Sequence, residues 1–149
     1  MARHSPDCVF CAILGGQVPG SVVYEDDRVV ALMDISPVNP GHLFVIPREH
    51  APYMADVDEE TGGHLFRVAM RLAESLRASG LRCEGINLFL ADGEAAFQEV
   101  PHVHLHVFPR FKGDAFKIDA NWDTHPARED LDAAAAAIRE AYDRLYSHS

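Results

Sequence analysis

The chain has 149 residues, of which 48% are hydrophobic, and a formal net charge of −10 with its histidines counted as neutral. This length suits one compact domain, residues 1–149, with enough apolar side chains for a core. No apolar run approaches the roughly 18 to 20 residues that cross a bilayer, so we expect no membrane partner. The acidic balance argues against a nucleic-acid partner, which needs a basic face, but it allows a small phosphorylated ligand in a local pocket.

The N-terminal segment and the cysteines indicate the compartment. The first ten residues, MARHSPDCVF, contain no apolar signal core, so nothing argues for secretion. Three cysteines are too few for a disulfide framework. We therefore expect a reduced, cytoplasmic protein.

The first half of the chain predicts one short helix, three strands and one long helix. Residues 8–14, CVFCAIL, can form a helical turn. Residues 22–33 read as a hairpin with its turn at 25–28. After a proline-rich loop, HLFVIP at 42–47 predicts a strand. From residue 59 to residue 79 the apolar period becomes helical, and the glycine that follows ends the helix.

The second half predicts two strands and a final helix. INLFLA (86–91) and HVHLHVF (102–108) are the strands, and the acidic loop DGEAAFQEVP (92–101) joins them. A helix over 129–146 carries one apolar face. The whole pattern predicts an α+β domain: an antiparallel sheet of about five strands, a central helix and a C-terminal helix.

The last predicted strand places His102, His104 and His106 at every second position. Side chains of a strand alternate between faces, so the three imidazoles share one face and the aliphatic residues between them share the other. Three such imidazoles can bind a metal, perform acid, base or nucleophilic work near neutral pH, or form a solvated polar face. Their strict alternation beside a loop with glycine and glutamine argues against the solvated face.

Cys8 and Cys11 form a CxxC pair. Such a pair can be a redox site, half of a zinc site or two small core residues. Redox pairs of this kind normally follow a strand of a βαβ unit, and this pair begins the chain, so the redox interpretation is weak. A zinc site needs two further ligands.

The spacing His-φ-His-φ-His-φ-φ, with φ apolar, resembles the signature of the histidine triad (HIT) superfamily. The resemblance also includes CVFCAIL, VVYEDDRVVALMDISPVNPGHLFVIPREH and FQEVPHVHLHVFPR, in order, over about residues 8–112. It points to the bacterial zinc-containing CxxC type. It implies the HIT-like fold in a single HIT domain, a homodimer whose sheets join, and a hydrolase or transferase that acts on the α-phosphate of nucleotide conjugates.

The resemblance also implies the catalytic roles. His104 would be the nucleophile and would form a nucleotidyl-histidine intermediate that water then cleaves. His106 would contact the non-bridging phosphate oxygens. Gln98, with backbone N–H groups around Glu99 and Val100, would help to hold the phosphate and the leaving group.

A nucleoside pocket and a metal site follow from the same resemblance. Asp34 would accept hydrogen bonds from the ribose hydroxyls of an adenosine-type nucleotide. The apolar base pocket would be formed by residues that plain core packing explains equally well: Val9, Phe10, Ile13, Leu32, Ile35 and Phe44. A structural zinc would be held by four ligands: Cys8, Cys11, His50 and His102. His42 is interpreted as structural.

Two positions depart from the family pattern and bear on the substrate. The nucleoside phosphoramidase branch has asparagine where this chain has Ala91, and Asn87 comes four residues too early to replace it. Many members have glycine where this chain has Phe97. The expected substrate is an adenosine phosphoramidate or an acyl adenylate.

Three alternatives stay open from the sequence. The first is hydrolysis or phosphorolysis of dinucleoside polyphosphates. The second is a purine-nucleotide-binding module with little activity. The third is a metallohydrolase whose zinc is held by the three triad histidines.

Overall fold

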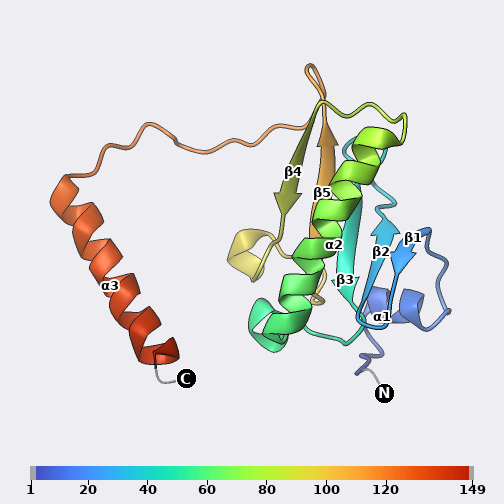
Figure 1. Ribbon diagram of the computed structural model, residues 1–149, viewed down its shortest axis with the longest axis horizontal. Coiled ribbons are helices and arrows are strands. Elements are labelled where there is room, and N and C mark those ends of the chain that lie inside the picture. Colours follow the sequence, from blue (N-terminus) through green and yellow to red (C-terminus); the bar gives the residue numbers. More distant parts are fainter. Residues whose placement is uncertain (1–2, 148–149) are drawn as a thin grey trace. The chain divides into compact units, whose positions relative to one another are not determined.

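The computed structural model describes residues 3–147 (Figure 1). The contacts within the chain define two compact units, one that ends at Phe116 and one that starts at Lys117. The first two and last two residues of the predicted single domain lie outside the described residues. One domain over 1–149 stays a prediction.

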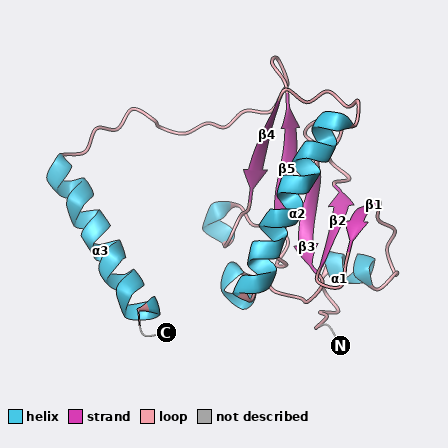
Figure 2. Ribbon diagram, viewed as in Figure 1, coloured by secondary structure: helices cyan, strands magenta, loops and turns pink. Residues whose placement is uncertain are grey.

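The first unit is built on a five-stranded sheet in the order β1-β2-β3-β5-β4, with every neighbouring pair antiparallel. The strands, drawn as magenta arrows in Figure 2, are β1 Val22–Glu25, β2 Val29–Met33, β3 Leu43–Pro47, β4 Gly85–Phe89 and β5 Leu105–Arg110. This arrangement confirms the predicted α+β class and antiparallel sheet.

The helices are α1 Val9–Leu14, α2 Glu59–Ala78 and α3 Arg128–Tyr146, with two short 3-10 turns at Met54–Asp56 and Glu94–Ala96. The long helix α2 starts where Asp58 accepts a hydrogen bond from the Thr61 amide at 2.8 Å, which satisfies one of the free N–H groups of the first turn. It ends before Gly80, whose φ of +87° favours glycine.

The two faces of the sheet carry different layers. Helix α2 lies across one face (Figure 1) and packs on alternate strand residues, among them Ala31, Val45 and Val107. The opposite face packs against α1 through Phe10, with Phe44 beside it. The period of two in the strands therefore produces a purely aliphatic core on the α2 side and leaves the other side for the histidines.

The predicted last strand starts three residues later than the sequence pattern suggested, at Leu105 instead of His102. The ladder between β3 and β5 ends at the pair Val45–Leu105, so the segment before Leu105 is not paired with β3, although β3 continues to Pro47. The Val103 amide instead donates to the Ala51 carbonyl at 2.8 Å. The alternation nevertheless continues through this segment, because Val103 belongs to the α2-side core and His102 does not.

The second unit contains α3, which agrees with the predicted C-terminal helix within one residue at its start. None of its residues is buried, and its apolar side chains, such as Ile138 and Tyr142, are exposed. Within residues 3–147, no helix has the length and apolar content that a membrane span requires.

Candidate active site

A cavity of about 520 Å³ opens on the histidine side of the sheet. Its size is typical of small-molecule sites. Eleven residues that the sequence predicted for catalysis or substrate binding line it: Val9, Phe10, Ile13, Leu32, Asp34, Ile35, Phe44, Glu99, Val100, His104 and His106. They come from α1, from the end of β2, from β3, from the loop before β5, and from the segment and strand that carry the triad. The cavity thus brings together side chains that lie almost a hundred residues apart.

His104 is held in one tautomer by its own backbone. Its Nδ1 lies 2.8 Å from the carbonyl oxygen of His102, and a carbonyl can only accept, so Nδ1 carries the proton. The Nε2 lone pair is then free, and within residues 3–147 it has no hydrogen-bond partner. Phe10 packs edge-on against the ring, with 5.1 Å between the centroids. The hydrogen bond therefore fixes the orientation of the ring and leaves Nε2 as its unpaired nitrogen at the cavity wall.

His106 follows on β5 and lies beside His104, with 4.8 Å between the ring centroids. Phe108 stacks on it at 5.2 Å, and Phe44 is its cross-strand neighbour. Burial, and then the neighbouring imidazoles of His104 and His42, lower the pKa of His106 from 6.5 to about 4. His106 is therefore neutral at pH 7 and can offer a hydrogen bond without a formal charge.

Asp34 lies at the end of β2 and lines the same cavity. Its Oδ1 accepts a hydrogen bond from the Ser36 amide at 2.8 Å, which fixes the carboxylate. Its Oδ2 lies 3.5 Å from Nε2 of His42. Ile35, by contrast, is almost fully exposed at the cavity rim.

Gln98 is the one predicted active-site residue that does not line the cavity. Its Oε1 accepts from the Gly93 amide at 2.8 Å, and its Nε2 donates to the carbonyls of Pro52 at 2.6 Å and Val100 at 3.1 Å. Both ends of the side chain thus hold the loop before β5 in shape. A direct catalytic role for Gln98 stays a prediction.

The two departures from the family pattern both fall on the cavity wall, since Ala91 and Phe97 line it. Phe97 has a φ of +70°, a left-handed conformation that favours glycine, and its side chain is 82% exposed. This explains why glycine suits the position. Asn87 does not replace the missing asparagine, because its Oδ1 accepts from Arg110 at 2.7 Å.

The four predicted metal ligands converge on one point. The Sγ atoms of Cys8 and Cys11 and one ring nitrogen each from His50 and His102 all lie within 4.8 Å of one another. Two of the sulfur–nitrogen distances, Cys8 to His102 and Cys11 to His50, are 3.4 Å. Tetrahedral zinc, with bonds of about 2.3 Å to sulfur and 2.0 Å to nitrogen, needs about 3.6 Å between such ligands.

The surroundings of this cluster suit a metal as well. Nε2 of the fully buried His102 lies 2.8 Å from the Pro47 carbonyl and must carry the proton, so the Nδ1 lone pair faces the sulfurs. The Cys11 amide points at the sulfur of Cys8, and the Ser5 amide at that of Cys11, each at 3.4 Å. These donors stabilise thiolates. The residues present fit a zinc ion.

The triad itself does not form a metal site. Among the described residues, the only groups of three or more potential ligands that converge are the cysteine–histidine cluster and Asp34, His42 and His106. His102 faces the cysteines, whereas His104 and His106 face the cavity. The geometry therefore does not support the metallohydrolase alternative.

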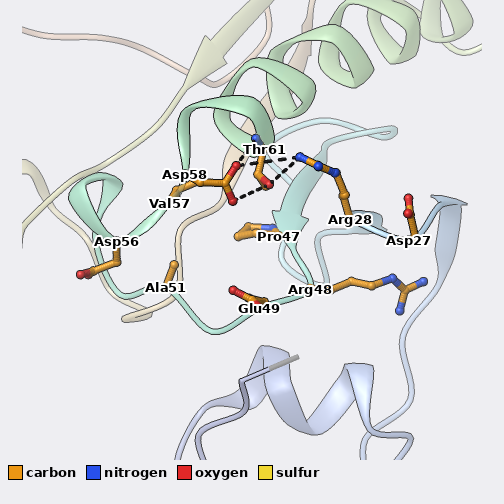
Figure 3. A pocket seen from close by; sticks show the side chains of 10 residues that line it. All are labelled: Asp27, Arg28, Pro47, Arg48, Glu49, Ala51, Asp56, Val57, Asp58 and Thr61. Carbon is orange, nitrogen blue, oxygen red and sulfur yellow. Dashed lines mark hydrogen bonds and ion pairs between the residues drawn. The ribbon is translucent and has the colours of Figure 1, made fainter. Parts of the chain in front are cut away.

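A second hollow, of about 330 Å³, lies around the start of α2 (Figure 3). Both cations in its wall, Arg28 and Arg48, have acidic partners; that of Arg48 is Glu25, at 3.7 Å. Arg28 points at the Asp58 and Thr61 pair that begins the helix, at 3.9 Å and 3.4 Å, and also bonds Glu60 at 3.2 Å. With both cations paired and no histidine in its wall, this hollow is a poor candidate for the chemistry.

His42 is the cavity residue that sequence reasoning missed. It lines the cavity, is 3% exposed, and its Nε2 lies 2.9 Å from Nδ1 of His106. The two histidines are far apart in the sequence, and β3 must pair with β5 before they meet. No local pattern signals this contact.

Comparisons with known proteins agree with this geometry. A family model described as the HIT domain matches residues 15–113, more than half of the chain. The chain is similar to the crystal structure of a HIT family protein from Bacillus anthracis, with 37% identity and a TM-score of 0.82, over 92% of this chain and 98% of that one.

Two further solved structures are similar. A zinc-bound histidine triad family protein from Mycobacterium smegmatis is 40% identical, with a TM-score of 0.71, over 91% of this chain and 97% of that one. A HIT family hydrolase from Legionella pneumophila is 32% identical, with a TM-score of 0.58, over 78% of this chain and 98% of that one. The chain therefore belongs to the HIT domain family, whose members are generally nucleotide hydrolases and transferases.

Proposed function

We propose that this protein hydrolyses the α-phosphate linkage of nucleoside monophosphate conjugates, of the adenosine phosphoramidate or acyl-adenylate type, through a nucleotidyl intermediate on His104. The observation that carries the proposal is the hydrogen bond from His104 Nδ1 to the His102 carbonyl. It leaves Nε2 as the nitrogen available for attack, at the wall of a cavity of about 520 Å³. Membership of a nucleotide-acting family and the similarity to a HIT family hydrolase support the same conclusion.

The chemistry takes two steps. In the first, His104 Nε2 forms a bond to phosphorus while the bond to the leaving group breaks, and the proton on Nδ1 stays there, hydrogen-bonded to the His102 carbonyl. In the second, water breaks the nitrogen–phosphorus bond and releases the nucleoside monophosphate. The leaving group takes up a proton from the solvent as it departs. In the second step the hydroxyl of water goes to phosphorus, and its other proton returns to the solvent. His106 would donate to a non-bridging oxygen, and Asp34 would bind the ribose.

The test is intact-protein mass spectrometry after rapid quenching with adenosine 5′-phosphoramidate. We expect an adduct of one nucleoside monophosphate on the wild type and on His125→Ala, which removes an exposed histidine far along the chain. We expect no adduct on His104→Ala and a loss of turnover of at least about 10³-fold. An adduct that persists on His104→Ala contradicts the assignment of the nucleophile.

Two alternatives for the same cavity have their own outcomes. Faster turnover of diadenosine tetraphosphate than of the phosphoramidate would favour a dinucleoside polyphosphate hydrolase or phosphorylase. Tight binding of the monophosphate without turnover of either compound would favour a binding module. The second outcome has a structural basis, because the alanine side chain at Ala91 offers no hydrogen bond to a phosphate.

We also propose a structural zinc at Cys8, Cys11, His50 and His102. Their convergence, and the zinc-bound relative from Mycobacterium smegmatis, support it. When bound, the zinc would fix the N-terminal segment to the chain before β5, and it would take no part in bond cleavage. Elemental analysis should find about one zinc per chain in the wild type. The proposal fails if the wild type purified without chelators contains none.

Matched cysteine variants make the zinc test specific. Cys8→Ala should lose the metal and a large part of the stability that the metal provides. Cys83→Ala should keep both, since its sulfur lies outside the cluster and contacts the Gly85 carbonyl. Equal zinc content in the two variants would show that the cluster does not hold the ion.

A homodimer whose sheets join, and a cytoplasmic location, complete the proposal. The edge of the sheet at β4 supports the dimer, because the strand has one ladder partner among the described residues and exposes Leu88 and Phe89. Light scattering should give twice the chain mass for the wild type. It should give a lower mass for Leu88→Lys, which places a charge on that strand.

A further inference from the structure

The two histidines at the back of the cavity form a directed hydrogen-bond chain. The Val38 amide lies 3.2 Å from Nδ1 of His42, and Nε2 of His42 lies 2.9 Å from Nδ1 of His106. An amide N–H can only donate, so Nδ1 of His42 must accept and Nε2 must carry the proton of the neutral ring. That proton points at Nδ1 of His106, which therefore accepts.

The direction of the chain determines what His106 shows to a ligand. With Nδ1 accepting, the proton of the neutral His106 ring must be on Nε2. Within residues 3–147, this atom has no hydrogen-bond partner, and the residue lines the cavity. We propose that His42 is a positioning residue that holds His106 as the neutral Nε2–H tautomer, ready to donate to a phosphate oxygen. The catalytic part of this inference rests on the proposed function, whereas the tautomer does not.

The opposite direction and a metal can both be excluded on the same grounds. If His106 donated to His42, the proton of His42 would sit on Nδ1 and face the Val38 N–H, two donors 3.2 Å apart. A cation held by Asp34, His42 and His106 would take the Nε2 lone pair of His42 and force the same clash. A doubly protonated His42 would also place a donor at Nδ1, facing the Val38 N–H.

The groups that face His106 show what His42 prevents. Asp34 Oδ2 lies 4.0 Å from Nδ1 of His106, close enough to favour a charged ring. His104 and His42, on the other sides, disfavour that charge, as does burial. Without the His42 donor, the nearest partner of His106 Nδ1 is the Asp34 carboxylate, which can only accept a hydrogen bond. His106 would then gain a proton on Nδ1, and its pKa would rise.

The experiment compares two substitutions of His42 by nitrogen-15 NMR of the imidazole rings. His42→Gln keeps an acceptor for the Val38 amide and a donor for His106, whereas His42→Phe keeps the ring shape and removes both. His106, assigned by its absence from His106→Gln, should be the neutral Nε2–H tautomer at pH 7 in the wild type and in His42→Gln. In His42→Phe it should show a proton on Nδ1.

Kinetics provide the functional half of the test. With adenosine 5′-phosphoramidate as substrate, His42→Phe should lower kcat about tenfold and change KM little. This loss is smaller than the 10²- to 10³-fold loss of kcat expected when a hydrogen-bond donor to the transition state is removed altogether. His42→Gln should restore most of the turnover. If His42→Phe does not fold, the wild-type spectrum still decides, because an Nδ1–H or cationic His106 at pH 7 would overturn the inference. An Nε2–H tautomer without turnover by any variant would instead leave the inference standing and contradict the proposed function.

Discussion

The lowered pKa of His106 makes the stability of the protein depend on pH. The native ring stays neutral down to a pKa of about 4, whereas the unfolded chain binds a proton near pH 6.5. As the pH falls below 6.5, the unfolded state gains a proton that the native state does not, so the free energy of unfolding decreases until about pH 4. The difference of about 2.5 pKa units corresponds to a loss of at most about 3 kcal/mol.

The assay is urea unfolding of the wild type and of His106→Gln in parallel from pH 7.5 to pH 4. Both proteins share every other titrating group, including Asp34 and the metal ligands, so the difference between their unfolding free energies isolates the ring. We expect the advantage of the wild type to shrink by up to about 3 kcal/mol over this range. A difference that stays constant within about 0.5 kcal/mol would refute the desolvation of His106 as the cause.

Three further predictions concern the cavity wall and the core. Phe97→Gly should remove a strain of about 1–2 kcal/mol from the left-handed backbone, but glycine also raises the conformational entropy of the unfolded chain. The two effects oppose each other, so the free energy of unfolding in urea should change by no more than about 1 kcal/mol. The KM for bulky conjugates should change, because Phe97 lines the cavity. Ala91→Asn should raise the turnover of adenosine 5′-phosphoramidate, measured by release of the monophosphate; slower turnover would show that the buried position lacks room for the amide. Leu65→Ala, on the buried face of α2, should cost about 2–4 kcal/mol in chemical denaturation and leave KM unchanged.

The elements with a clear hydrophobic period were predictable from the sequence. Helix α2 has its apolar residues at helical spacing, begins at an aspartate cap and ends before a glycine, and the structure places it within one residue of the prediction. The start of β5 was not predictable in the same way. Alternation extends back to His102, but a strand also needs a hydrogen-bonded neighbour, and the ladder with β3 ends at the pair Val45–Leu105.

Site residues that belong to a sequence motif could be predicted, whereas contacts that form only in the tertiary structure could not. The four predicted zinc ligands converge, as the resemblance implied. Both polar atoms of the Gln98 side chain instead form hydrogen bonds to backbone groups of Gly93 and Pro52, and no sequence pattern indicates these contacts. His42 and His106 meet only through strand pairing, so an isolated histidine gave no reason to expect a partner.

In the alternating segment from His102 to Val107, substitutions at odd-numbered and even-numbered positions should have different effects. Odd positions, such as Val103 and Leu105, contribute to the aliphatic core under α2, and even positions face the cysteine–histidine cluster or the cavity. A systematic substitution scan of this segment should therefore give two interleaved profiles. Abundance in the cell should drop at the odd positions, and specific activity should drop at His104 and His106 with little loss of abundance.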